Sequence, residues 1–273
     1  LLTVREVHGE RTGVLHRLLG QSLRAHMPPA RAARVLASCA WAVESHWSFD
    51  PADTSTWSKA TDAIEHVQAV GRHTLSLLRS ATASASTSAP ASAPASAPNA
   101  PGTATSVSDD EHRALLAALQ LRVSALLTQG ALCMSMALSR FEPARQALDA
   151  ARAIQELPLL AAGCEGSVAL RRGRALTLDT AGKVARYCGL LGEAEALLRD
   201  ALALWRELGD EGGESVALHE LGVVSLRRAD YNGATALLQH SLEMKRQRRR
   251  TSREVIGGGG RPGPKEARFS EEA

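Results

Sequence analysis

The histidine and glycine-rich patterns of this chain are the ones that could support chemistry, but none forms a complete arrangement. His219-Glu220 begins like the zinc-binding helix of metalloproteases, yet the second histidine does not follow. His66 and His73 stand two helical turns apart, without a cysteine or carboxylate at metal-site spacing. The glycines at 257–260 precede no Gly-Lys-Ser/Thr sequence, so they do not form a phosphate-binding loop. The sequence therefore predicts no catalytic residues, no metal and no cofactor.

The cysteines do not form a redox or metal motif either. They are far apart, include no Cys-x-x-Cys pair and lie in segments with helical patterns: Cys39, Cys133, Cys164 and Cys188. This arrangement is typical of reduced core thiols in an intracellular protein. We therefore expect a cytoplasmic protein whose thiols lie in the core.

Positive charge is concentrated in one short run near the end of the chain. The run contains six basic residues and no acidic ones: Lys245, Arg246, Arg248, Arg249, Arg250 and Arg253. The whole chain has a net charge of +3, but without the run 26 basic residues face 29 acidic ones, a net charge of −3. Such a run can contact nucleic acid or an anionic surface. The interpretation we favour is a solvated helix end, stabilised by the negative pole of the helix dipole.

Two stretches 40 residues apart share one internal spacing. The later stretch reads Leu218-x-x-Leu221-Gly222-x-x-Ser225, then Ala234-x-x-x-Leu238-x-x-Ser241. The earlier stretch reads Leu178-x-x-Ala181-Gly182-x-x-Ala185, then Ala194-x-x-x-Leu198-x-x-Ala201. In both, the first alanine stands 12 positions after the glycine. A fixed spacing of this kind indicates a helical repeat.

The pattern resembles the tetratricopeptide repeat (TPR), a pair of antiparallel helices with small residues where they cross. The repeat-defining residues are Gly182 and Gly222 in the first helix of each copy, and Ala194 and Ala234 in the second. The tryptophan and proline positions of the family are not filled. The 40-residue period resembles the longer repeats of kinesin light chains and of signalling ATPases. A weaker third copy matches at Phe141, Ala144, Leu148 and Ala151, with Leu132 in place of the glycine.

The TPR resemblance also implies a groove lined by the first helix of each copy. The groove residues that it implies are Asp179, Lys183, Arg186 and Tyr187 in the earlier copy, and His219, Val223, Leu226 and Arg227 in the later one. Three cations would make this groove locally positive, suited to acidic peptide segments or a terminal carboxylate. The alternative is that these are solvated helix charges.

Composition favours an all-α fold, an antiparallel helix-pair solenoid. The chain has only nine aromatic residues, and its apolar content is mostly Ala, Leu and Val. Residues 80–108 are almost entirely Ser, Ala, Pro and Thr, and 251–273 are rich in Gly and charge, so both are predicted to be disordered. The predicted organisation is a helical region at 1–79, a linker at 80–108, repeats at 109–250 and a tail at 251–273. No stretch is predicted to span a membrane.

The region before the linker carries a second resemblance. Three motifs follow one another there: His16-Arg17-Leu18, the nine residues from Phe49-Asp50 to Thr56-Trp57, and His66-Val67-x-Ala69-Val70. Their order is similar to the junction between the winged helix and the TPR array in STAND ATPases of the NB-ARC class. This resemblance implies a β-hairpin at residues 4–16, with its turn at 8–13. It also implies that the chain, which begins with Leu1, continues from an ATPase core.

The function that we predict is a non-enzymatic protein-protein interaction module, the partner-sensing end of a STAND-type signalling ATPase. A kinesin-light-chain-like scaffold adaptor is one alternative. Nucleic-acid or anionic-surface binding through residues 245–253 is another, although nucleic acid is not the expected partner. The expected partners are proteins or peptides, with self-assembly left open and no membrane.

Overall fold

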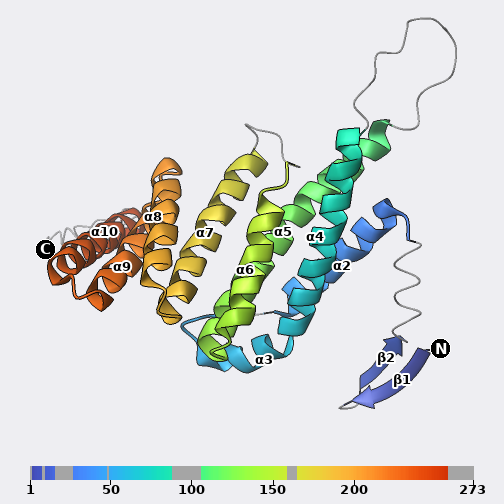
Figure 1. The fold of residues 1–273 in the computed structure, drawn as a ribbon, viewed down its shortest axis with the longest axis horizontal. Coiled ribbons are helices and arrows are strands. Elements are labelled where there is room, and N and C mark those ends of the chain that lie inside the picture. Colours follow the sequence, from blue (N-terminus) through green and yellow to red (C-terminus); the bar gives the residue numbers. More distant parts are fainter. Residues whose placement is uncertain are drawn as a thin grey trace, which may run out of the picture.

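The computed structural model describes residues 2–7, 10–15, 27–47, 49–87, 106–158 and 165–257, and nearly all of them are helical. The elements are β1 (Leu2–Val7), β2 (Glu10–Leu15), α2 (Pro29–His46), the 3-10 turn η1 (Thr54–Thr56), α3 (Trp57–Asp62), α4 (Ile64–Thr87), α5 (Ser106–Ala137), α6 (Phe141–Gln155), α7 (Glu165–Tyr187), α8 (Leu191–Glu207), α9 (Glu211–Arg227) and α10 (Tyr231–Gly257). From α4 to α10 the helices stand side by side in chain order (Figure 1). The predicted all-α solenoid is confirmed.

A short antiparallel hairpin precedes the helices. Leu2 of β1 pairs with Leu15 of β2, and Val7 pairs with Glu10. The hairpin expected from the second resemblance is therefore present, but its strands are longer than expected. Only residues 8 and 9 separate them, where the sequence predicted a turn over 8–13.

Consecutive helices are joined by one recurring type of turn. The second residue after the helix has a left-handed backbone: φ is 79° at Gly189 after α7, 63° at Gly209 after α8 and 61° at Ala229 after α9. The next residue then donates its N–H to a carbonyl five positions back, as in Leu190 to Ala185 O at 2.9 Å. This hydrogen bond satisfies a helix-end carbonyl that would otherwise lack a partner. Ser139, with φ of 50°, holds the same place after α5.

Helices on both sides of the predicted linker share one core. The buried side chains of that core include Ala40 of α2, Leu78 of α4, Leu119 of α5 and Leu148 of α6. A Cβ built on Gly71 of α4 would lie 2.6 Å from Leu127 Cδ2 of α5, so these helices are in close contact. The Ser/Ala/Pro segment therefore does not separate two independently packed regions among the residues described.

The boundaries of that segment differ from those expected. Helix α4 continues to Thr87 and α5 begins at Ser106, so residues 80–87 and 106–108 of the predicted linker are helical. Alanine is the best helix former, and Ala81 packs against the core, which supports the extra turns. Residues 88–105 lie outside the described part of the chain.

Helix α2 packs through Ala33 and Ala40, which are fully buried, and Leu36 and Val43 pack partly buried against the same core, whereas Val35 and Cys39 are exposed. The small side chains let α2 approach its neighbours closely. Ala63 separates α3 from α4. Trp57 donates its indole N–H to the Asp50 carbonyl at 3.0 Å, which closes the turn before α3.

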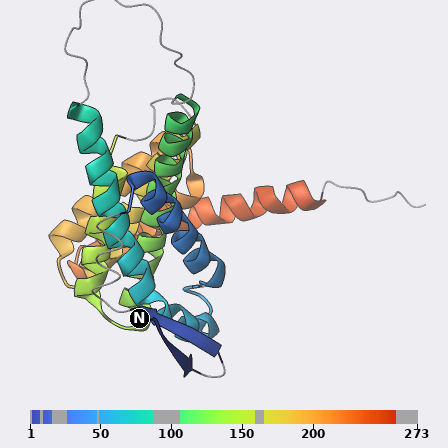
Figure 2. The same cartoon turned by 90° about the vertical axis from the view of Figure 1, so that its right-hand side faces the viewer.

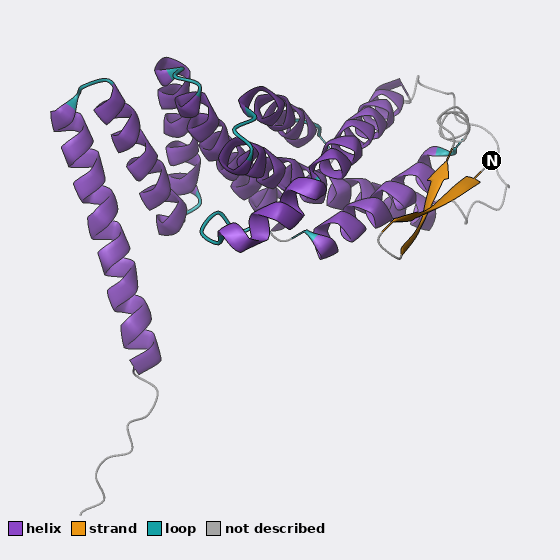
Figure 3. Ribbon diagram, turned by 90° about the horizontal axis from the view of Figure 1, so that it is seen from below, coloured by secondary structure: helices purple, strands orange, loops and turns teal. Residues whose placement is uncertain are grey.

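Helix α10 passes the predicted start of the C-terminal tail. It extends to Gly257, and its C-terminal end projects away from the other helices (Figures 2 and 3). Gly209 ends α8 with its left-handed backbone, but 40 residues later Arg249 occupies that place. Arg249 keeps a helical backbone, so α10 continues past this position. Residues 258–273 lie outside the described part.

One described helix has the length and apolar composition of a membrane span, contrary to the sequence expectation. It is residues 110–137 of α5. Leu119, Val123 and Leu127 of this helix are buried in the protein core. Interior packing explains its apolar composition, because a helix covered on most sides by other helices is apolar around most of its surface.

Candidate peptide-binding face

The four repeat-defining small residues lie where the paired helices cross. A Cβ built on Gly182 of α7 would lie 2.5 Å from Leu198 Cγ of α8, and one on Gly222 of α9 would lie 2.7 Å from Leu238 Cγ of α10. On the second helices, Ala194 and Ala234 are buried and present their carbonyl oxygens to these glycines. Close contact at both crossings fixes the orientation of α7 and α9, which carry the predicted groove residues.

Two ion pairs occupy the middle of the predicted groove. Lys183 Nζ lies 2.8 Å from Asp179 Oδ2 within α7, and Arg186 Nη2 lies 3.1 Å from Glu220 Oε2 of α9. Asp179 and Arg186 are nearly buried, so these charges are shielded from solvent. Burial raises the pKa of Asp179, against the opposing effect of Lys183, and the nearby Glu220 raises it further. The pair between Arg186 and Glu220 joins the two helices.

The remaining groove residues form the accessible part of this face. Tyr187 and Leu226 are exposed by 41% and 48% of their surfaces, which is high for large apolar side chains. The Arg186 guanidinium lies 4.5 Å from the centre of the Tyr187 ring, and Arg227 Nη1 donates to the Arg186 carbonyl at 3.3 Å. These contacts bring Tyr187 and Arg227 together at the C-terminal ends of α7 and α9. His219 is exposed and Val223 half-buried on the same helix as Leu226.

The structure changes the charge expected for this groove. Of its three cations, Lys183 and Arg186 are paired with carboxylates, and only Arg227 has no carboxylate partner among the described residues. The predicted cationic groove is therefore nearly balanced, with one accessible positive charge. Sequence reasoning missed Glu220 because it weighed this residue only as part of a zinc motif.

Two further residues were missed by sequence reasoning. Phe141 stacks on Tyr187 with ring centres 5.9 Å apart, and only the fold brings these residues together. Leu176 is 49% exposed on α7, at helical spacing before Asp179 and Lys183. Its spacing of three, seven and eleven residues from Asp179, Lys183 and Tyr187 was a usable signal.

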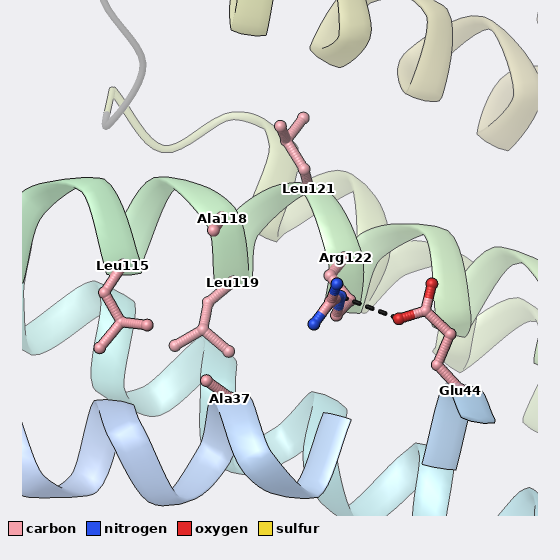
Figure 4. A pocket seen from close by; sticks show the side chains of 7 residues that line it. All are labelled: Ala37, Glu44, Leu115, Ala118, Leu119, Leu121 and Arg122. Atoms are coloured by element: carbon pink, nitrogen blue, oxygen red, sulfur yellow. Dashed lines mark ion pairs between the residues drawn. The ribbon is translucent and has the colours of Figure 1, made fainter. Parts of the chain in front are cut away.

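Two shallow hollows lie away from this face. The first, of about 420 Å³, lies between α2 and α5 and has Leu115, Leu119 and Ala37 along its wall (Figure 4). Arg122 Nε and Glu44 Oε2 close one end of it with an ion pair of 2.9 Å. The second, of about 350 Å³, lies between α6, α7 and α8 and includes Arg152, Arg174 and Asp200. Within the described residues, no group of three His, Cys, Asp or Glu side chains could hold a metal ion.

The cysteines differ in part from the expected core thiols. Cys133 is buried, and burial raises the pKa of its thiol to about 11. Cys39 and Cys188 are exposed free thiols, so the expectation that they are core residues was wrong. Cys164 lies outside the described residues.

One family model matches part of the chain. The tetratricopeptide repeat model matches residues 173–247, which include most of α7 and α10 and all of α8 and α9. None of the curated proteins compared with the chain matches it. Two crystal structures of a kinesin light chain from Podosopora anserina with TPR-like repeats are similar at TM-score 0.33. One is 16% identical and the other 15%, and they cover 82% of this chain and 100% and 99% of their own. Likeness at this level has no bearing on function.

Proposed function

We propose that this chain is a non-enzymatic protein-interaction module that binds a peptide segment across α7 and α9. The observation that carries the proposal is the pair of Tyr187 and Leu226. Both are exposed on adjacent helices of a TPR segment, and the helices beneath them are joined by the ion pair between Arg186 and Glu220. Binding energy at protein interfaces is concentrated in a few residues, among which Tyr and Arg are enriched.

The charge of the face suggests the chemistry of the partner. Arg227 is exposed beside these apolar side chains and uses one guanidinium nitrogen on the Arg186 carbonyl. Its other donors can take a carboxylate in a charge-assisted hydrogen bond. We expect a segment with an apolar side chain next to one acidic group, which is narrower than the generally acidic partner that the sequence suggested.

Capture of partners by the full chain tests the proposal. The test variant is Tyr187→Ala/Leu226→Ser/Arg227→Gln, which leaves the buried ion pairs in place. The matched control changes exposed residues of the same types elsewhere, namely Tyr231→Ala and Leu242→Ser on α10 and Arg79→Gln on α4. We expect the control to retain the partners of the wild type and the test variant to lose them, with both folded by circular dichroism.

Direct binding then defines the recognised segment. Peptides covering a captured partner are titrated into the full chain by calorimetry, and replacing the acidic residue of the binding peptide with its amide should weaken binding about tenfold, roughly the effect of one charged hydrogen bond. Partners retained unchanged by the test variant would contradict this location of the site.

We further propose that the module is the sensing end of a STAND-type signalling ATPase. The hairpin of β1 and β2, the helices α2 to α4 and the TPR segment occur in the order that this class requires, which supports the proposal. Sequencing the coding region upstream of Leu1 tests it. An in-frame Gly-x-x-x-x-Gly-Lys-Ser/Thr loop between a strand and a helix is expected. An upstream region without one would favour the scaffold-adaptor alternative.

A further inference from the structure

The basic run begins level with the first turn of α9 and continues onto the part of α10 that α9 does not cover. Helix α9 has 17 residues and α10 has 27, so about ten residues of α10, roughly 15 Å, extend past their partner. Figures 2 and 3 show this end of α10 projecting away from the other helices. Residues 245–250 lie at the base of the projection.

Four of the cations in this run share one side of the helix. At 100° per residue, Lys245, Arg246, Arg249 and Arg250 lie within an arc of about 140°. The three arginines are exposed and Lys245 is half-buried. We call these four residues the α10 stripe. Arg248 lies outside this arc and faces α9, where its Nη1 would be 2.8 Å from a Cβ built on Gly212.

Among the side chains that the structure describes, no carboxylate pairs with the α10 stripe. The ion pairs of the arginines on α7 and α8 join them to Asp or Glu, as in Arg206 with Glu214 at 2.8 Å. No ion pair between described residues includes a residue of the stripe. Within this part of the chain, the charges of the stripe are open to an anion from outside the protein.

The helix dipole does not explain the stripe. Its effect is confined to the last turn of a helix. Arg250 stands seven residues before Gly257, which is two turns from the end of α10. Of the whole run, only Arg253 stands within about one turn of the helix end, four residues before Gly257, so the dipole acts on that residue and not on the stripe.

The stripe also replaces the surface that would receive another repeat. In the preceding pair, Trp205 of α8 is buried against Gly213 of α9, where a Cβ would meet its ring at 2.2 Å. Forty residues later, Lys245 occupies the place of Trp205. A charged side chain there cannot form the same apolar contact, so this side of α10 is suited to a charged partner instead of a further helix pair.

We propose that the α10 stripe binds the phosphate backbone of double-stranded DNA without marked sequence preference. A projecting helix about 10–12 Å wide fits a major groove about 12 Å wide. The corresponding groove of duplex RNA is too narrow for it. An acidic protein surface fits less well, because the centres of protein interfaces combine arginine with aromatic side chains and the stripe contains no aromatic residue.

Fluorescence anisotropy with a labelled 20-base-pair DNA duplex and the full chain tests this proposal. Between 50 and 200 mM salt, the affinity should fall about 100-fold, as expected for three to four released counterions. The variant Lys245→Gln/Arg246→Gln/Arg249→Gln/Arg250→Gln should lose at least about tenfold in affinity at 50 mM salt and most of the salt dependence. Glutamine is a good helix former, so α10 should persist in circular dichroism.

Two variants separate the stripe from general charge and from folding. Arg31→Gln/Arg34→Gln/Arg72→Gln/Arg79→Gln makes the same change in net charge with exposed residues of α2 and α4, and it should bind like the wild type. Arg246→Lys/Arg249→Lys/Arg250→Lys keeps the stripe positive and should retain binding, since lysine also binds phosphate.

Three outcomes would overturn the proposal. The first is no duplex binding by the wild type at 50 mM salt. The second is an equal loss in the α2/α4 variant. The third is binding to polyglutamate or to phosphatidylserine vesicles without binding to the duplex, which would assign the stripe to a protein or membrane partner.

Discussion

Glycine at two helix crossings controls how closely the repeats pack. Gly182 and Gly222 face Leu198 and Leu238 at distances that no Cβ tolerates without a shift. Leu198 is fully buried in the core of its helix pair and cannot move away freely, whereas Leu238 is half-buried. The ion pair between α7 and α9 also constrains the residues there. Arg186 and Glu220 are nearly buried, so replacing either one would leave the other charge without its partner.

Gly182→Ala and Gly222→Ala should each destabilise the protein by about 1–3 kcal/mol, since an added methyl overpacks the crossing. Urea unfolding followed by circular dichroism measures this change. Gly192→Ala is the matched control, because Gly192 is helical and exposed and a Cβ there would have its nearest neighbour at 3.5 Å. It should leave stability unchanged or raise it by up to about 1 kcal/mol. Equal losses in all three variants would contradict the assigned crossings.

The recurring turn is the element that builds the array. Gly189 and Gly209 adopt the left-handed backbone at little cost, whereas Ala229 adopts it with a side chain. The same N–H to carbonyl bond follows in each case, including Asp230 to Ser225 O at 3.0 Å. The turn before α10 is therefore strained compared with the other two.

Ala229→Gly should stabilise the protein by about 0.5–1 kcal/mol, because relief of the left-handed strain exceeds the entropy that glycine adds to the unfolded chain. Differential scanning calorimetry would show a higher Tm. The reciprocal variant Gly209→Ala should lower Tm, since φ is 63° there and nothing lies within 4 Å of a Cβ. If both variants moved Tm in the same direction, backbone strain would not be the cause.

At the scale of the whole molecule, the chain packs as a continuous row of helices. The core shared by α2, α4, α5 and α6 extends to Val184 of α7, and a second core holds α7, α8 and α9 together. The two sides of the segment 88–105 thus meet in one interior. Buried contacts, and not the connecting segment, hold α4 beside α5.

Cleavage within 88–105 should leave the two fragments associated. A specific protease site introduced there and cut to completion should yield fragments that co-elute in size-exclusion chromatography at the mass of the intact chain, because α4 and α5 share buried contacts such as Gly71 with Leu127. Uncut protein is the reference. Fragments that separate under native conditions would show two independent units, as the sequence organisation suggested.

The sequence by itself determined what depends on local spacing. The positions of Gly182, Ala194, Gly222 and Ala234 predicted the helix pairs, because close crossing requires small residues at a fixed separation along the chain. It also located the basic run, since a cluster of charge is visible without a fold. The helical class followed from the apolar composition.

Only the tertiary structure decided how distant side chains combine. It paired Arg186 with Glu220 and Phe141 with Tyr187, so the predicted cationic groove became a nearly neutral face with exposed apolar anchors. It also showed that α2 packs through Ala33 and Ala40 and that α10 extends beyond the end of α9. These results depend on which surfaces meet in space, and a pattern read along one segment does not contain the shape or charge of the segment that packs against it.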